Sequence, residues 1–281
     1  MNENKYRGIA RTEKRFVYMW KWETEGKPKA VIVIVHSAYE HHRRYAWLIE
    51  KLRSSNFHIV MGDLPGHGEL KKSKTIHDES FELYKNYIKQ AMQVAVTYDL
   101  PIFLMGHGLG ATLLIKVLRK LDIEYAGVIL TSPWLQLQKL PSKWTNTLAK
   151  LSIPQKINHD IHLNELTRNY EVIQQFISDP TYRTFISTEW YKELQTLMKS
   201  VNQLEISIPN KPILVMTGER DKIAETNAVA GWLKKQELSE YQYKEWKNCF
   251  HDLYHEPERE EIFTYSQSFI HNVLTDLGYI V

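Results

Sequence analysis

The sequence has a single cysteine, Cys249, among its 281 residues. One cysteine excludes an internal disulfide, which fits a reducing compartment, so we expect a cytoplasmic protein. Apolar runs of membrane-spanning length are also missing, since a run such as Val31–Val35 is far too short to cross a bilayer. The first residues, MNENKYRGIARTEKR, are too polar to form the apolar region of a signal peptide.

A large excess of charge of one sign is absent as well. The formal net charge is +3, and basic and acidic residues are interspersed, so we expect no nucleic-acid partner. The densest basic run, Lys71-Lys72-Ser73-Lys74, predicts a solvated loop that makes at most peripheral contact with an anionic membrane surface. Apolar residues make up 43% and charged residues 25%, which is typical of a globular protein with room for one large domain and an insertion.

Short apolar runs alternate with amphipathic stretches along most of the chain. Strands are predicted at Arg15–Trp22, Ala30–Val35, His58–Met61, Ile102–Met105, Gly127–Leu130, Pro212–Met216 and Glu240–Trp246. Helices are predicted at His42–Ser55, Ser80–Tyr98, Ala111–Leu118, Glu225–Lys235 and Arg259–Leu274. This alternation predicts an α/β fold with a mostly parallel sheet and with its ligand site at the carboxyl ends of the strands.

The pattern changes after Pro133. From residue 136 to residue 207 the sequence shows helical periodicity, as in Glu165–Phe176 and Thr188–Leu204, and no buried-strand run. We therefore predict a helical cap at 136–207, inserted into a core made of 1–135 and 208–281 and lying over the carboxyl ends of the strands.

The stretch Pro101–Ile115 organises the predicted site. An apolar strand runs into the glycine-rich turn Gly106-His107-Gly108-Leu109-Gly110, and a helix follows at once. This is the setting of the G-x-S-x-G nucleophile elbow, in which a serine sits on a strained turn and the flanking glycines allow strand and helix to approach. The central position here is Gly108, so the elbow has no nucleophile.

The partners of such a nucleophile follow in the required order, an acid and then a histidine. Asp221 follows the strand Pro212–Met216, and His251 follows the last strand. Taken singly, Asp221 could equally be a helix N-cap and His251 a surface histidine. The backbone N–H groups of Leu109 and Ala38 are the candidate donors of an oxyanion hole.

Several short motifs accompany the elbow between Trp20 and Phe269. They are His36-Ser37-Ala38-Tyr39-Glu40-His41 with Arg44-Tyr45, Gly62-Asp63-Leu64-Pro65-Gly66-His67-Gly68, Leu166-Thr167-Arg168-Asn169, Asp221-Lys222, and His251 with His255-Glu256-Pro257-Glu258-Arg259. Together they resemble the lysophospholipase and monoacylglycerol lipase-like branch of the α/β-hydrolases. The resemblance implies an α/β-hydrolase fold with a cap, no cofactor, and hydrolysis of small-molecule acyl esters such as lysolipids. Two positions depart from that family: Ser37 replaces a glycine and Gly108 replaces the nucleophile serine.

The missing hydroxyl leaves three interpretations open. The chain is an ester hydrolase in inactivated form, or a non-catalytic pseudo-hydrolase that binds an acyl or lipid-like ligand, or an enzyme rescued by Ser37, Cys249 or a water activated by His251. Without a hydroxyl at residue 108 no acyl-enzyme forms at that position. We therefore predict no measurable esterase turnover, and a gain of orders of magnitude on short-chain esters for Gly108→Ser.

Two further motifs point to other chemistries. Gly106–Ala111 matches the dinucleotide fingerprint G-x-G-x-x-G/A, but it follows at least three strands instead of opening the first βα unit. His251 and His255 have the i, i+4 spacing of a zinc helix but lack its glutamate and a third ligand. We expect neither a dinucleotide nor a metal, and the sequence leaves the oligomeric state open.

Overall fold

A computed structural model of the chain describes residues 4–6, 18–68, 76–141, 156–203 and 208–279. The basic run Lys71-Lys72-Ser73-Lys74 lies outside the described residues. So do Arg15–Val17, the first part of the earliest predicted strand, and Leu204, the last residue of a predicted helix.

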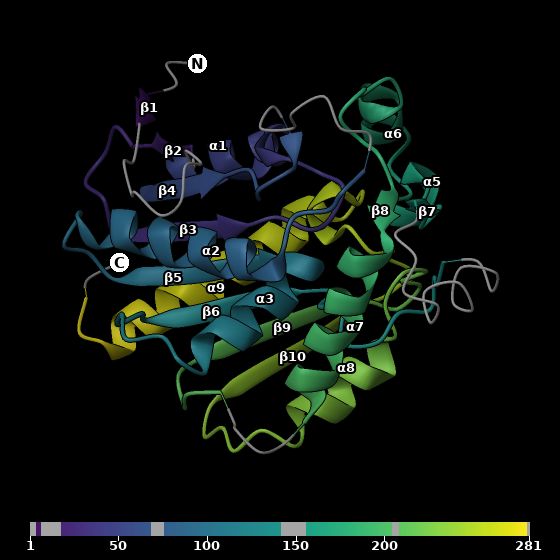
Figure 1. The fold of residues 1–281 in the computed structure, drawn as a ribbon. Helices are drawn as coiled ribbons and strands as arrows, with labels where there is room; N and C mark the ends of the chain where they lie inside the picture. Colours follow the sequence, from purple (N-terminus) through teal and green to yellow (C-terminus); the bar gives the residue numbers. More distant parts are fainter. Residues whose placement is uncertain (1–3, 7–17, 69–75, 142–155, 204–207, 280–281) are drawn as a thin grey trace.

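Eight strands of the described residues form one sheet in the order β1-β2-β4-β3-β5-β6-β9-β10 (Figure 1). Their bounds are Asn4–Tyr6 for β1, Met19–Trp22 for β2, Ala30–Val35 for β3, Phe57–Gly62 for β4, Ile102–His107 for β5, Gly127–Thr131 for β6, Ile213–Gly218 for β9 and Tyr241–Trp246 for β10. Within this sheet, neighbouring strands in the run β4-β3-β5-β6-β9-β10 pair in parallel, whereas β2 pairs antiparallel with both β1 and β4. The predicted mostly parallel sheet is confirmed.

Helices cover both faces of this sheet, and strand β3 shows the consequence. Val31, Val33 and Val35 pack into one core with α2 (Phe81–Val96), α3 (Leu109–Leu118) and α8 (Thr226–Leu233). Ile32 and Ile34 pack into a second core with α1 (Ala46–Ser54) and α9 (Arg259–Asp276). Figure 1 shows α2 and α3 on the near face of the sheet and α9 on the far face. A strand buried on both faces needs an unbroken apolar run, which is what AVIVIV supplies.

The segment predicted as a cap is not purely helical. Strand β7 (Lys156–Asn158) pairs antiparallel with β8 (Phe185–Ser187), and between them lie the short helices α5 (Leu163–Leu166) and α6 (Tyr170–Phe176). The single helix predicted for Glu165–Phe176 is therefore wrong. Helix α7 (Thr188–Asn202) closes the segment, which lies at the carboxyl ends of the strands in Figure 1.

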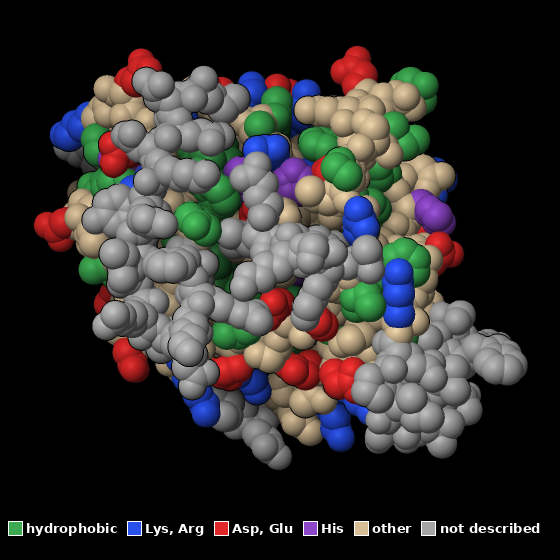
Figure 2. All heavy atoms as spheres, turned by 45° about the horizontal axis from the view of Figure 1, so that its top comes forward, with side chains coloured by type: hydrophobic (Ala, Val, Ile, Leu, Met, Phe, Trp, Pro, Cys, Tyr) green, Lys and Arg blue, Asp and Glu red, His purple; other side chains and the backbone are tan. Residues whose placement is uncertain are grey.

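Acidic and basic side chains are interspersed on the face turned forward in Figure 2. None of the described helices combines the length and the apolar character needed to cross a membrane.

Candidate functional site

The elbow keeps the backbone of a nucleophile turn. Strand β5 ends at His107, and Gly108 precedes α3 with φ 52° and ψ −117°, a region that side chains with a Cβ rarely adopt. The flanking glycines are required by space. A Cβ on Gly106 would lie 2.8 Å from the Ala111 Cα, and one on Gly110 would lie 2.3 Å from the Val35 carbonyl oxygen.

An acid and an imidazole meet beside this turn. Asp221 follows β9 and His251 follows β10, and both strands end at the same edge of the sheet as β5. The His251 Nδ1–H donates to Asp221 Oδ2 over 2.8 Å, with both side chains buried. Asp221 Oδ1 accepts two backbone N–H groups, from Ile223 and Ala224, which lie before α8. The N-cap of α8 is Glu225, so Asp221 is not the helix N-cap that the sequence left open. This hydrogen-bonded pair has the geometry of the acid and base of a serine hydrolase.

The other nitrogen of His251 is occupied by a residue that the sequence reading missed. Trp134 follows β6, and its indole Nε1–H donates to His251 Nε2 over 3.0 Å. Because Nε2 accepts and Nδ1 donates, the imidazole is neutral and protonated at Nδ1. The Ser132 hydroxyl also donates to the His251 carbonyl oxygen over 2.8 Å, which fixes the loop. In a working triad Nε2 accepts the nucleophile's hydroxyl, so the indole takes the place of that hydrogen bond.

Ser37 fills the other side of the nucleophile position. The Leu109 N–H, one of the two expected oxyanion donors, donates to Ser37 Oγ over 3.1 Å. Ala38, the other expected donor, is the next residue in the chain; it is buried, and together with Ser37 it lines a small pocket described below. The expected residues Ala38, Leu109, Gly108, Asp221 and His251 thus converge on one site, and its central space is taken up by Ser37 and Trp134.

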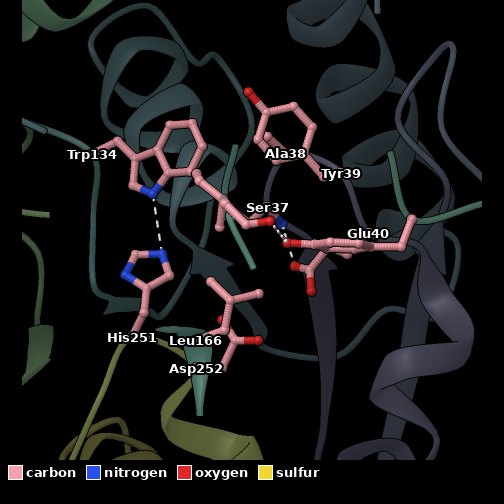
Figure 3. Close-up of a pocket in the computed structure, with 10 residues that line it drawn as sticks. Ser37, Ala38, Tyr39, Glu40, Trp134, Leu166, His251 and Asp252 are labelled. Atoms are coloured by element: carbon pink, nitrogen blue, oxygen red, sulfur yellow. Dashed lines mark hydrogen bonds between the residues drawn. The ribbon is translucent and has the colours of Figure 1, made fainter. Parts of the chain in front are cut away.

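A small pocket opens beside the His251 imidazole (Figure 3). In this view Trp134 and His251 face one another on one side, Glu40 lies on the other, and Ser37 lies between. The wall also includes Leu166 from α5. Its free volume is about 10 Å³, which is close to the room one water molecule needs. An acyl chain would therefore enter only if parts of the wall moved.

A buried ion-pair network, two of whose members line the pocket, joins the surrounding loops. The Arg44 guanidinium donates to Glu40 over 3.2 Å and to Asp252 over 2.8 Å, and the His107 Nε2–H donates to Asp252 over 2.8 Å. Glu40 in turn accepts the Ser37 backbone N–H over 2.6 Å. One network therefore holds the loop after β3, the end of β5 and the loop carrying His251.

The charges in this network stabilise one another. Burial alone would raise the pKa of the Asp252 carboxyl, but His107 and Arg44 hold that pKa far below its usual range. Burial alone would lower the pKa of His107, but its hydrogen bond to Asp252 and that residue's charge raise it above the ordinary value. The other ring nitrogen of His107, Nδ1, lies within hydrogen-bond distance of Thr131 Oγ1, at 3.0 Å.

The structure also places the other candidates from the sequence. The Cys249 thiol is fully buried against Glu258, and burial raises its pKa to about 12, so it is a poor nucleophile. His255 Nε2–H donates to the Arg44 carbonyl oxygen over 2.7 Å.

One group of side chains at the site offers metal-ligand atoms: in the described part of the chain, ligand atoms of His107, His251 and Asp252 lie within 4.8 Å of one another. Both nitrogens of His251 and of His107 already make hydrogen bonds to protein groups. The ring nitrogens of this group therefore have hydrogen-bond partners in the protein without a bound ion.

Known proteins share this architecture. A family model described as serine aminopeptidase, S33, matches residues 26–258. The phospholipase YtpA of Bacillus subtilis strain 168 is 36% identical over 259 residues, covering 89% of this chain and 98% of the phospholipase. The monoglyceride lipase of Mus musculus is 22% identical over 256 residues, covering 88% of this chain and 84% of the lipase.

Solved structures show the same fold. The monoacylglycerol lipase of Paleococcus ferrophilus superposes with a TM-score of 0.79 at 24% identity, covering 92% of this chain and 98% of the lipase. A soluble variant of monoglyceride lipase from Saccharomyces cerevisiae, in complex with a substrate analogue, gives a TM-score of 0.82 at 16% identity and 94% coverage of both chains. The chain belongs to the serine aminopeptidase S33 family of the α/β-hydrolases.

Proposed function

We propose that this chain is a lipase-like α/β-hydrolase that has kept the acid–base pair and lost ester turnover. The observation that carries the proposal is the occupation of the nucleophile position. Gly108 has no hydroxyl, Ser37 takes the Leu109 N–H, and Trp134 takes His251 Nε2. A hydrolase of this type needs all three: a hydroxyl to attack, a free N–H for the oxyanion and a free imidazole nitrogen for the proton.

The rescue interpretations gain no support from the site. Ser37 Oγ accepts a hydrogen bond from Leu109, while the His251 nitrogen that would activate it accepts one from Trp134. Cys249 pairs with Glu258. We therefore favour a protein whose site holds an acyl ester or lysolipid without cleaving it, the ligand class that the names of YtpA and the monoglyceride lipases suggest.

Two measurements on the unaltered chain test this proposal. The expected results are no hydrolysis of p-nitrophenyl butyrate or of a monoacylglycerol above a His251→Ala control, and no labelling by a fluorophosphonate. Titration with an ether analogue of a lysolipid, which cannot be hydrolysed, should raise Tm as ligand binds the folded state. Turnover that disappears in His251→Ala would overturn the loss of catalysis, and an unchanged Tm would overturn the ligand class.

A further inference from the structure

We infer that Ser37 and Gly108 are a matched pair: the Ser37 side chain occupies the space of the absent nucleophile, so a serine at residue 108 can work only after Ser37 is removed. This inference rests on the proposed function, because it concerns the same acid–base pair. It changes the expectation drawn from the sequence, in which Gly108→Ser alone restores activity.

The argument from space is direct. A Cβ built on Gly108 would lie 2.1 Å from Ser37 Oγ, 2.8 Å from Ser37 Cβ and 3.2 Å from Trp134 Nε1. Contacts under 3.0 Å do not occur for real Cβ atoms, so at least Ser37 must shift. Because of the 2.1 Å contact, the Ser37 hydroxyl cannot stay where it is once residue 108 has a Cβ. The 2.8 Å contact involves Ser37 Cβ, so it persists even for an alanine at residue 37.

Ser37 has little freedom to shift. Its backbone N–H donates to Glu40 over 2.6 Å, and its carbonyl oxygen accepts the His36 Nδ1–H over 2.7 Å. His36 is held in turn, because its Nε2 accepts the Leu64 N–H over 2.8 Å. Glu40 itself accepts from Arg44 and from the Tyr45 hydroxyl. The loop that carries Ser37 is therefore fixed on both sides by buried hydrogen bonds.

The two positions also complement each other in hydrogen bonding. The Leu109 N–H is fully buried at the start of α3, and a buried N–H without a partner is costly. Ser37 Oγ supplies that partner. Ser37→Gly alone removes it, while Gly108→Ser alone introduces a clash, so each single change harms the fold. The double change removes the clash and frees the N–H for an oxyanion.

The test compares Gly108→Ser, Ser37→Gly, the double variant Ser37→Gly/Gly108→Ser and the double variant Ser37→Ala/Gly108→Ser. We expect each single variant to lower Tm. Ser37→Gly/Gly108→Ser should melt above Gly108→Ser, because the clash is gone, but below the unaltered chain, because the Leu109 N–H has lost Ser37 Oγ. We expect its kcat/KM on p-nitrophenyl butyrate, and its rate of fluorophosphonate labelling, to exceed those of Gly108→Ser by about 10²-fold, the effect of one oxyanion donor. Ser37→Ala/Gly108→Ser should fall between them, because its Cβ remains. Adding His251→Ala to the best variant should abolish both signals.

The outcomes separate the two proposals. If Gly108→Ser alone is folded and as active as Ser37→Gly/Gly108→Ser, the inference is wrong while the loss of turnover in the unaltered chain stands. If the unaltered chain itself hydrolyses esters through His251, the proposed function is wrong. A folded double variant that neither labels nor melts above Gly108→Ser overturns the inference. So does a double variant that fails to fold when Gly108→Ser folds.

Discussion

At the scale of the single residue, the elbow combines the backbone of a nucleophile turn with a residue that has no side chain. Gly108 still has a positive φ, 52°, although it carries no nucleophile. The turn is held by its neighbours: the Gly108 N–H donates to the Thr131 carbonyl oxygen, and its own carbonyl accepts the Thr112 N–H. Glycine adopts this conformation without strain, so the turn needs no side chain at residue 108 to keep its shape.

Gly108→Ala tests how tightly this position is packed. The added methyl meets Ser37 at 2.1 Å and sits at a positive φ. We expect the free energy of unfolding to fall by about 2–4 kcal/mol, from strain and overpacking together, as measured by urea denaturation. Gly231→Ala in α8 is the matched control, because its methyl meets nothing within 4 Å. That control should stabilise by about 0.5–1 kcal/mol, and equal effects at the two glycines would contradict the packing argument.

Trp134 and Ser37, which fill the space beside Gly108, were harder to predict than the candidate catalytic positions themselves. Gly108 and Asp221 follow apolar strands and His251 follows the last strand, and the ends of these strands were predicted from the sequence. Trp134 also follows a strand, but its contact with His251 spans 117 residues of chain. Ser37 was noted as a departure from the family's glycine, yet no local pattern indicates that its Oγ points at Leu109. Such contacts depend on side-chain directions that emerge only when loops from different strands pack.

At the scale of elements, the predicted central strands, now β3, β5, β6 and β9, were confirmed because burial on two faces leaves continuous apolar runs. The short pair β7 and β8 has no such signal, since each strand has three residues. The break between α5 and α6 comes from polar contacts. Asn169 caps α6, and Arg168 pairs with Glu256 over 2.6 Å and with Glu258. Helical periodicity alone could not show that Arg168 would form ion pairs with residues almost 90 positions later in the chain.

The link between the loop after β3 and the cap segment predicts a pH dependence. His159 Nδ1 accepts the Tyr39 hydroxyl over 2.6 Å, and its Nε2–H donates to the Lys139 carbonyl over 2.8 Å. Burial lowers the pKa of His159 from 6.5 to about 4. Because the unfolded chain binds this proton below pH 6.5 and the folded chain does not, stability is lost as the pH falls from 6.5 towards 4.

We expect this site to contribute a loss of about 2 kcal/mol in the free energy of unfolding between pH 7 and pH 5. Urea denaturation at both pH values, compared for the unaltered chain and His159→Gln, measures it. The variant should lose less stability on acidification, because glutamine takes up no proton. His162→Gln, which removes an exposed imidazole nearby, is the control. An unaltered chain and a His159→Gln variant with the same pH dependence would show that His159 does not act in this way.

At the scale of the whole molecule, the sheet divides the interior into two cores, and the apolar side chains of the predicted cap that the structure describes pack into only one of them. The core formed by α2, α3 and α8 continues into residues of the cap segment, including Ile157, Ile186 and Trp190. The opposite core, with α1 and α9, contains none of them among the described residues. On the side of α9 the cap is held by polar contacts instead, such as the ion pair between Arg168 and Glu256.

Hydrogen exchange tests how firmly each part of the cap is held. Helix α7 is tied to the core: the Trp190 indole N–H donates to the Tyr84 hydroxyl over 2.9 Å, and Arg119 donates to the carbonyls of Ser200 and Val201. We therefore expect amides of α7 to exchange as slowly as those of β3 and β5, through global unfolding. Amides of α5 and α6 should exchange faster, through local opening. The sequence boundary at 136–207 would then contain two units, an opening part and a fixed helix. If α5, α6 and α7 exchange together, the segment moves as one cap, and the ties to Tyr84 and Arg119 do not hold α7 to the sheet.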